Sequence, residues 1–503
     1  MIEESRSVRI ASADPDVTDV PDEPVSPLGA LGQSVRGAGW LGLGAGVVKL
    51  SQTVVLLILA AILAPSALGV LAIGALVLNV TSAVTDLGSS TALVYWRGNV
   101  ERAARSALTL ALGLGLGLTA LAWVLAPWLS SALRSGDLGA DVIRGLMLCL
   151  PFYSVAGVSQ ELLRRELAFK RRVVPDIIGA LVGSVLAVLL ALSGRGVYSL
   201  VIGQLAQAAL IMVLCWAMRP PVRPGWRGSD VTGLVSYGGH LAGANILQLL
   251  MLNLDYLIVA RVLGPEPLGI YSMAFRLAYM PYLLVSVVLC GAAFAHLCRL
   301  EGDAVGRALA QVVTVLVTLT LPLYLGMILL APQLELLGHQ WGPGVPALRV
   351  LAVYGLVLSL VHLAVVALNS VDRTRDGFLL NLLHLVLLAA LLFWWSARGI
   401  EMVAMAQLVA GAAMLVAAVL VCRKQITGFG WRSIAVRLAP VGVGAVLMTV
   451  AALVAHHFFP GSVISVVGLL LVGALMVLVY LSPLVLLGRR SGLLAGELPG
   501  GRP

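Results

Sequence analysis

Long apolar runs alternate with short polar stretches along almost the whole chain. Runs of about twenty apolar residues recur between Gly39 and Leu487, and each can cross a hydrocarbon layer of about 30 Å as a helix. Proline, glycine and charged residues separate the predicted spans, whose approximate ranges are 40–63, 67–90, 105–127, 140–162, 173–193, 197–218, 233–262, 267–296, 306–331, 345–369, 377–396, 399–421, 434–458 and 462–487. The pattern predicts an all-α polytopic membrane protein with about 14 transmembrane helices.

The chain also repeats itself. Residues 62–70 read ILAPSALGV and residues 262–270 read VLGPEPLGI, while residues 195–205 match residues 398–408 at nearly the same offset. Six predicted spans lie in each duplicated half, so both halves enter the membrane from the same side. We therefore expect two parallel-repeat lobes related by an axis along the membrane normal, a common plan for transporters. The last two spans lie outside the duplication.

The predicted domain organisation follows from these spans. Residues 1–35 are acidic, contain four prolines and have no apolar signal core, and we expect a disordered cytoplasmic tail. An N-lobe with spans one to six covers 36–218, a proline-rich cytoplasmic linker covers 219–230, and a C-lobe with spans seven to twelve covers 231–424. Residues 425–503 hold spans thirteen and fourteen and a cytoplasmic C-tail.

Composition and charge agree with a membrane protein. Hydrophobic residues make up 60% of the chain and charged residues 11%, and the mean hydropathy is +1.00. With the N-terminus in the cytoplasm, 25 of the 33 lysines and arginines fall on the cytoplasmic side, five on the outer side and three within spans. This bias is typical of orientation in the plasma membrane, with both termini cytoplasmic, and it accounts for the net charge of +9 without a nucleic-acid partner.

Two charged residues are predicted near the middle of the bilayer. Asp255 and Arg276 lie on consecutive spans at similar depth, where a charge costs about 2.5–3.5 kcal/mol. In one interpretation they form a salt bridge. In the other they face a water-filled cavity, where Arg276 attracts an anionic substrate and Asp255 tunes it or carries a proton. Val55 and Leu76 hold the equivalent positions of the first half, so the shared fold does not require the pair.

Further polar residues within spans are candidates for the same cavity. Lys49, in the first span, either extends to the cytoplasmic face or enters the cavity as a substrate-binding residue. Asn245 and Asn253 belong to a polar group in the seventh span and either line the cavity or bond to neighbouring helices. Asp86, at the inner end of the second span, either meets the interface or takes part in coupling.

Signatures of catalysis and of metal binding are missing from the sequence. It contains no G-x-S-x-G, no P-loop, no H-E-x-x-H and no metal spacing among its five cysteines. We expect no enzyme activity and no cofactor, with an ion gradient or the membrane potential as the driving force.

Several stretches resemble one known family. Residues 254–265, continuing through 268–278 to Pro281, are similar to the seventh and eighth spans of Wzx-type polysaccharide flippases, in the MOP exporter superfamily. Residues 85–88, 163–171 and 196–201 fit the same family, and the resemblance covers about residues 40–425. It implies a V of two six-helix lobes around a central cavity, with two extra C-terminal helices. Arg276, Asp255 and Asp86 fall on recurring positions of the family pattern.

The resemblance also implies an activity. A flippase of this kind moves undecaprenyl-diphosphate-linked oligosaccharide across the plasma membrane by alternating access, for cell-surface, lipopolysaccharide or exopolysaccharide biosynthesis. Its partners are the anionic diphosphate head of the substrate, membrane lipids, and the polymerase and chain-length machinery. The main alternative is an ion-coupled multidrug or metabolite antiporter on the same fold. A membrane glycosyltransferase or polysaccharide polymerase is less favoured, because it would need a sizeable outer loop that this chain lacks.

Overall fold

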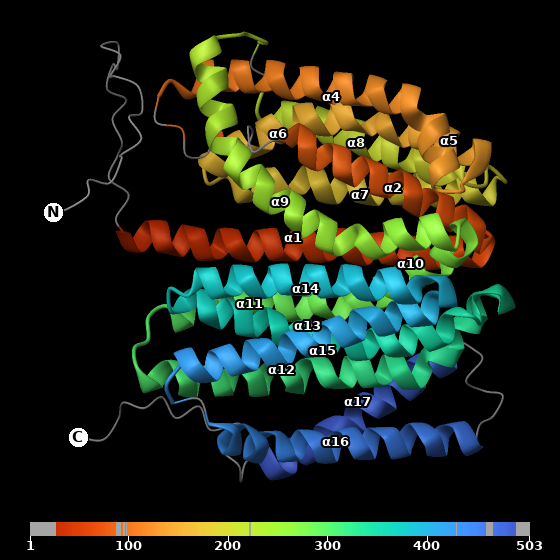
Figure 1. The fold of residues 1–503 in the computed structure, drawn as a ribbon, viewed down its shortest axis with the longest axis vertical. Coiled ribbons are helices and arrows are strands. Elements are labelled where there is room, and N and C mark those ends of the chain that lie inside the picture. Colours follow the sequence, from red (N-terminus) through yellow and green to blue (C-terminus); the bar gives the residue numbers. More distant parts are fainter. Residues whose placement is uncertain are drawn as a thin grey trace.

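The computed structural model describes residues 27–86, 92, 93, 96, 98–220, 223–428, 430–458 and 466–488. All regular elements in these ranges are helices, and most run roughly along one common direction (Figure 1). Eleven of them are long and apolar enough to cross a membrane. Three further helices, α1 (Pro27–Ile62), α9 (Gly228–Val262) and α17 (Val466–Gly488), occupy the remaining predicted ranges. The all-helical membrane fold is confirmed, whereas the exact number of 14 spans stays a prediction.

The first lobe is built from the helices that precede the proline-rich linker. They are α1 (Pro27–Ile62), α2 (Pro65–Asp86), α4 (Val100–Ala132), α5 (Gly136–Met147), α6 (Cys149–Arg165), α7 (Phe169–Leu192) and α8 (Tyr198–Met218). Helices α7 and α8 pack closely, and Gly183 and Gly203 each face the backbone carbonyl of the other. Small residues permit this approach of two helix backbones, as is usual within membranes.

The second lobe follows the linker and keeps the same order of long helices. It comprises α9 (Gly228–Val262), α10 (Pro265–Pro281), η1 (Tyr282–Ser286), α11 (Val287–Leu297), α12 (Asp303–Leu330), η2 (Ala331–Leu337), η3 (His339–Trp341), α13 (Gly344–Ser370), α14 (Thr374–Trp395), η4 (Ser396–Arg398) and α15 (Ile400–Gln425). The segment η1 is a π-helical turn that joins α10 to α11. Such turns occur frequently at functional sites.

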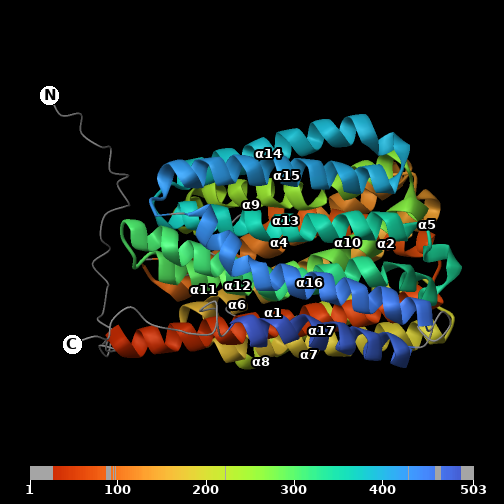
Figure 2. The same cartoon turned by 90° about the horizontal axis from the view of Figure 1, so that it is seen from below.

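Two further helices, α16 (Trp431–Phe458) and α17 (Val466–Gly488), pack beside the second lobe. Their buried cluster includes Met448, Met476 and Tyr480, and the hydroxyl of Tyr480 donates to the carbonyl oxygen of Thr318 on α12 at 2.9 Å. Figure 2 views the molecule from the side of these two helices. Their position at one edge agrees with their place outside the duplicated halves.

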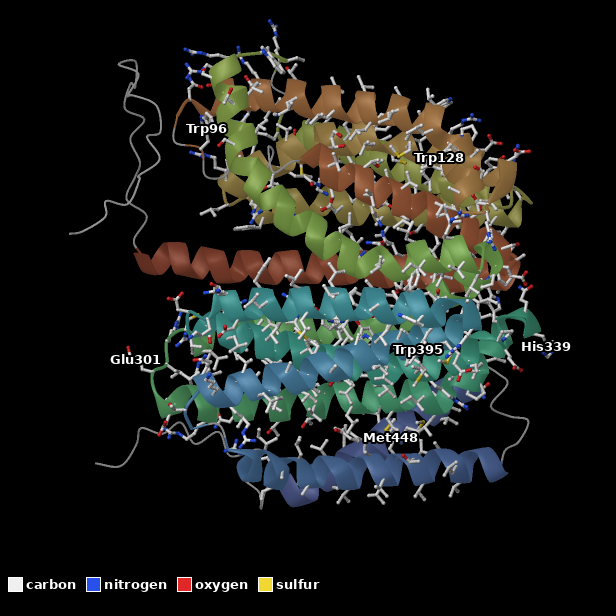
Figure 3. All side chains as sticks on the ribbon, in the orientation of Figure 1. Trp96, Trp128, Glu301, His339, Trp395 and Met448 are labelled. Atoms are coloured by element: carbon white, nitrogen blue, oxygen red, sulfur yellow. The ribbon has the colours of Figure 1, made fainter. Side chains whose placement is uncertain are left out.

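The predicted cytoplasmic turns lie at one end of the bundle, and the predicted outer turns lie at the other end. Trp96 and Glu301 lie at one end, here called the basic end, and His339 lies at the other, here called the opposite end (Figure 3). At the opposite end Nη1 of Arg134 donates to the carbonyl oxygen of Val262 at 3.1 Å, which joins two turns predicted on the same side. The helices therefore alternate in direction as the sequence predicts.

The two copies of the repeated motif meet at the opposite end. A Cβ on Gly69 would collide with the carbonyl oxygen of Pro265, and a Cβ on Gly269 would collide with the carbonyl oxygen of Pro65. This contact between α2 and α10 is reciprocal, as a two-fold relation between parallel repeats requires. The duplicated sequence thus forms the junction that holds the lobes together at this end.

The helices that open the two halves pack differently. Helix α1 lies on α7 of its own lobe, with Gly44 directly against Val173. Helix α9 instead begins on the first lobe, where Asp230 pairs with Arg102 at 3.3 Å and Gly233 faces Trp96. Figure 1 shows α9 running obliquely from beside α4 and α6 toward α1. The first turns of α9 begin at the end of the predicted linker at 219–230, but they pack against the first lobe.

Candidate functional site

A cavity of about 1040 Å³ lies between the two lobes. Its walls come from α1, α2, α6, α7 and α8 on one side and from α9, α10, η1 and α13 on the other. At the opposite end the crossing of α2 and α10 holds the walls together. There the fully buried Trp341 of η3 also donates its Nε1 hydrogen to the carbonyl oxygen of Ala60 on α1, at 2.9 Å. The lobes are thus closed against each other at that end.

Two cationic side chains enter this cavity from different lobes. Lys49 lies on α1 and Arg276 on α10, and both line the cavity with exposed side chains. Within the described part of the chain, neither side chain forms an ion pair with a carboxylate. The two positive charges lie close enough to interact with each other. A pair of unneutralised cations in an enclosed space attracts an anionic ligand.

Asp255 lies outside the cavity wall. Its carboxylate is fully buried and accepts hydrogen bonds from the hydroxyl of Tyr271 at 2.7 Å and from Nε2 of Gln407 at 3.1 Å. The backbone N–H of Tyr256 donates to it at 2.9 Å. The salt bridge expected with Arg276 is therefore not formed, and the expectation of a cavity-facing Asp255 was wrong.

Helical geometry explains this correction. Asn253 and Tyr256 both line the cavity and are three residues apart on α9, so they share one face of the helix. Asp255 is about 100° away from Tyr256 around the helix axis and points into the lobe. Equal depth in the membrane therefore did not imply that the two charged side chains meet.

The buried carboxylate positions part of the cavity wall instead. Tyr271 holds one oxygen of Asp255 and also packs against Tyr256, with ring centroids 6.0 Å apart. Tyr256 in turn packs edge-on to Phe275 at 5.8 Å, and both of these rings line the cavity. Asp255 is thus a positioning residue for the aromatic side of the cavity.

The remaining predicted site residues have mixed outcomes. Asn253 lines the cavity, and its Nδ2 donates to the carbonyl oxygen of Leu249 at 2.9 Å. The side chains of Asp86 and Asn245 lie outside the described residues, so their predicted roles stay predictions. In the described part of the chain, no three histidine, cysteine or acidic residues gather as a group able to hold a metal ion.

Sequence reasoning missed the acidic residue that does reach the cavity. Asp176 of α7 is the one carboxylate among the described lining residues, and it accepts a hydrogen bond from Nε2 of Gln160 on α6 at 2.8 Å. Gln204 and Gln207 of α8 line the same wall. In the sequence Asp176 follows Pro175 near the start of a span, so it resembles an ordinary helix-end residue. Its position near the first turn concealed its proximity to the cavity.

The fold and the cavity together define the class of this protein. Two like-oriented helical lobes surround a central cavity, with two additional helices beside the second lobe, as in a solved MATE transporter of the MOP superfamily. Residues 58–346, more than half of the chain, match the family described as "Polysaccharide biosynthesis protein". The chain belongs to this family.

Curated relatives agree with this family. The chain is 27% identical to the succinoglycan biosynthesis transport protein ExoT of Rhizobium meliloti (strain 1021) over 345 residues, which are 67% of this chain and 66% of ExoT. It is 22% identical to the lipopolysaccharide biosynthesis protein WzxC of Escherichia coli (strain K12), over 65% of this chain and 68% of WzxC. The match with ExoT thus spans slightly less than two thirds of that protein's length.

Solved structures share the fold. The lipid II flippase MurJ in an inward closed conformation superposes with a TM-score of 0.74 and 12% identity, over 89% of this chain and 98% of MurJ. An inward-facing multidrug resistance MATE transporter superposes with a TM-score of 0.60 and 14% identity, over 75% of this chain and 95% of that one. At these identities the similarity concerns the fold.

Proposed function

We propose that this protein is a flippase that moves undecaprenyl-diphosphate-linked oligosaccharide across the plasma membrane by alternating access. The observation that carries the proposal is the cavity between the lobes, into which Lys49 and Arg276 project without a carboxylate partner among the described residues. A diphosphate is the group on such a substrate that these cations would bind, because charge-assisted hydrogen bonds to phosphate oxygens are strong. The family membership and the transport role in ExoT's name support the same function.

The orientation belongs to the proposal. The basic end faces the cytoplasm, since lysine and arginine concentrate there, and both termini lie on that side. The contact of α2 with α10 then closes the cavity toward the outside. The diphosphate enters from the cytoplasmic leaflet, and separation of the lobes at the opposite end releases the substrate to the outer leaflet. The polymerase and chain-length machinery would receive it there.

A multidrug or metabolite antiporter is the second candidate, because a MATE transporter shares the fold. The two unpaired cations argue against cationic drugs as substrates, since like charges in a chamber of low dielectric repel. An anionic metabolite would satisfy them, and the experiment below separates it from a lipid-linked substrate. A membrane glycosyltransferase or polymerase is less favoured, because the relative ExoT is described as a transport protein.

The test uses the purified full chain and undecaprenyl diphosphate as the probe. Arg276→Ala is expected to weaken binding by about tenfold or more, because it removes a charge-assisted contact of about 1.5–3 kcal/mol. Arg144→Ala is the matched control, because Arg144 is a partly exposed arginine of α5 outside the cavity, beside Asp141. Equal affinity of the wild type and the Arg276 variant, or competition by a soluble anionic metabolite but not by the lipid, would overturn the proposal.

A further inference from the structure

The two walls of the cavity differ in chemistry. The wall formed by the first lobe carries mainly amide side chains, namely Gln52, Asn79, Gln160, Gln204 and Gln207, with one ring, Tyr153. The wall formed by the second lobe carries mainly aromatic rings, namely Tyr256, Phe275, Tyr279 and Tyr282, with one amide, Asn253. The cations Lys49 and Arg276 therefore mark only one part of a longer chamber, and the diphosphate does not account for the rest of its lining.

The aromatic wall forms a continuous surface. Phe275 and Tyr279 are stacked, with centroids 5.6 Å apart and planes 17° from parallel, and Tyr279 lies 4.9 Å from Tyr282. The π-turn η1 begins at Tyr282, where the hydroxyl also meets Nδ1 of His362 on α13. Rings arranged in this way offer apolar faces for packing.

The amide wall contains one carboxyl group, that of Asp176. Nε2 of Gln160 holds Oδ1 of Asp176 at 2.8 Å, while Oδ2 of Asp176 receives no side-chain hydrogen bond from another described residue. Gln207 of α8 lines the cavity on the same side. An ionised carboxylate only accepts hydrogen bonds, whereas an amide both donates and accepts. Together they suit a ligand with many hydroxyl groups.

Asp176 and Arg276 lie at different heights along the bundle. Arg276 is eleven residues from the start of α10, and Asp176 is sixteen residues before the end of α7. At 1.5 Å per residue, these positions are about 16 Å and about 24 Å from the opposite end. Asp176 therefore lies about 8 Å nearer the basic end. A bound diphosphate at Arg276 would place the sugars next to it within reach of Asp176.

We propose, on the basis of the proposed function, that Asp176, Gln160 and Gln207 form a subsite for uncharged sugar residues of the lipid-linked glycan. The sugar hydroxyl groups bond to the carboxylate and amides, and the apolar faces of the sugar rings pack on the aromatic wall opposite. A sugar carboxylate is rejected at this position, because Asp176 repels it in an enclosed site. Asp176 is thus a specificity-determining residue for the charge of the glycan.

The experiment measures the affinity of the purified full chain for three probes. These are undecaprenyl diphosphate, the same lipid bearing a neutral disaccharide, and the same lipid bearing a disaccharide that ends in glucuronic acid. The wild type is expected to bind the neutral glycolipid about tenfold more tightly than the glucuronic acid glycolipid. Asp176→Asn keeps the shape of the side chain and removes its charge. It is expected to reduce this ratio to about one.

Asp141→Asn is the control, because Asp141 is an exposed carboxylate of α5 beside Arg144, outside the cavity. It should keep the wild-type ratio. The inference is overturned if the wild type does not discriminate, or if Asp176→Asn weakens all three probes equally, as a purely structural contact of α6 with α7 would. Failure of the wild type to bind undecaprenyl diphosphate at all would instead count against the proposed function.

Discussion

The hairpin α1–α2 and the hairpin α9–α10 contain the two copies of the repeated motif, yet they differ in what they bury. At equivalent positions the first hairpin has Val55 and the second has Asp255. Likewise Leu71 of the first hairpin corresponds to Tyr271 of the second, whose hydroxyl donates to Asp255. The first copy is apolar where the second holds a buried polar network. The fold tolerates both, so the network has a local purpose.

The matched glutamines of the two halves show the same contrast. Gln407 is buried in the second lobe and donates to Asp255, whereas Gln204 lines the cavity in the first lobe. The same residue type at equivalent positions thus has two roles: Gln407 supports the cavity wall through Asp255, and Gln204 is part of the wall. The duplication supplies a scaffold with two-fold symmetry, and substitutions within it make the cavity asymmetric.

The largest effect is expected from substitutions in the glycine contact that the two hairpins share. Gly69→Ala and Gly269→Ala each place a Cβ against a backbone carbonyl of the partner hairpin, where no side chain can move aside. Each is expected to destabilise the closed junction by about 3 kcal/mol or more, at the upper end for overpacking. Thermal unfolding of the purified protein measures the loss, and the reciprocal geometry predicts similar losses for the two variants.

Gly113→Ala on α4 is the control for both glycine variants, because no atom lies within 4 Å of the position that the added methyl group would take. It should be neutral, or stabilising by about 0.5–1 kcal/mol, because alanine favours a helix over glycine. A neutral result at either Gly69 or Gly269 would contradict the symmetric junction.

The next largest effect is expected in the buried polar network around Asp255, which only the second hairpin has. Asp255→Val copies the first hairpin into the second and leaves the donors of Tyr271 and Gln407 buried without their acceptor. We expect a loss of about 2–4 kcal/mol in the free energy of unfolding, since an unsatisfied buried donor costs about 1–3 kcal/mol. Adding Gln407→Leu should recover part of it, because one orphaned donor is removed.

Gln204→Leu, at the equivalent position of the first lobe, is the control for Gln407→Leu. Its glutamine lines the cavity and makes no contact with a buried carboxylate. Its substitution should therefore show no energetic coupling to Asp255→Val. Strictly additive effects of Asp255→Val and Gln407→Leu would show that the network does not act as a unit.

The smallest effect tests a link between the lobes that has no counterpart in the repeat. Trp341→Phe keeps an aromatic ring in a fully buried site and removes the Nε1 hydrogen bond to Ala60. A loss of about 1 kcal/mol is expected in thermal unfolding, in line with one net hydrogen bond. Trp128→Phe, at an exposed tryptophan of α4, should leave stability unchanged. Equal shifts in the two variants would remove Trp341 from the junction.

Much of the architecture followed from the sequence. Apolar runs of the length of a bilayer leave a helix as the only way to satisfy the backbone, so the helical class and the approximate spans were predictable. The internal repeat and the alternating charge of the loops predicted two like-oriented lobes. Lys49 and Arg276 were also predicted as cavity residues, because an unexplained charge deep in an apolar helix needs a polar surrounding.

Only the tertiary structure decided which polar groups meet. Depth in the membrane placed Asp255 level with Arg276, but rotation about the helix axis turned Asp255 into the lobe and left the salt bridge unformed. Asp176 is near the start of its span in the sequence, yet the packing of α6, α7 and α8 brings it to the cavity beside Gln160. Periodicity along one helix fixes its faces relative to each other, whereas the face that meets the chamber is set by contacts with helices far away in the chain.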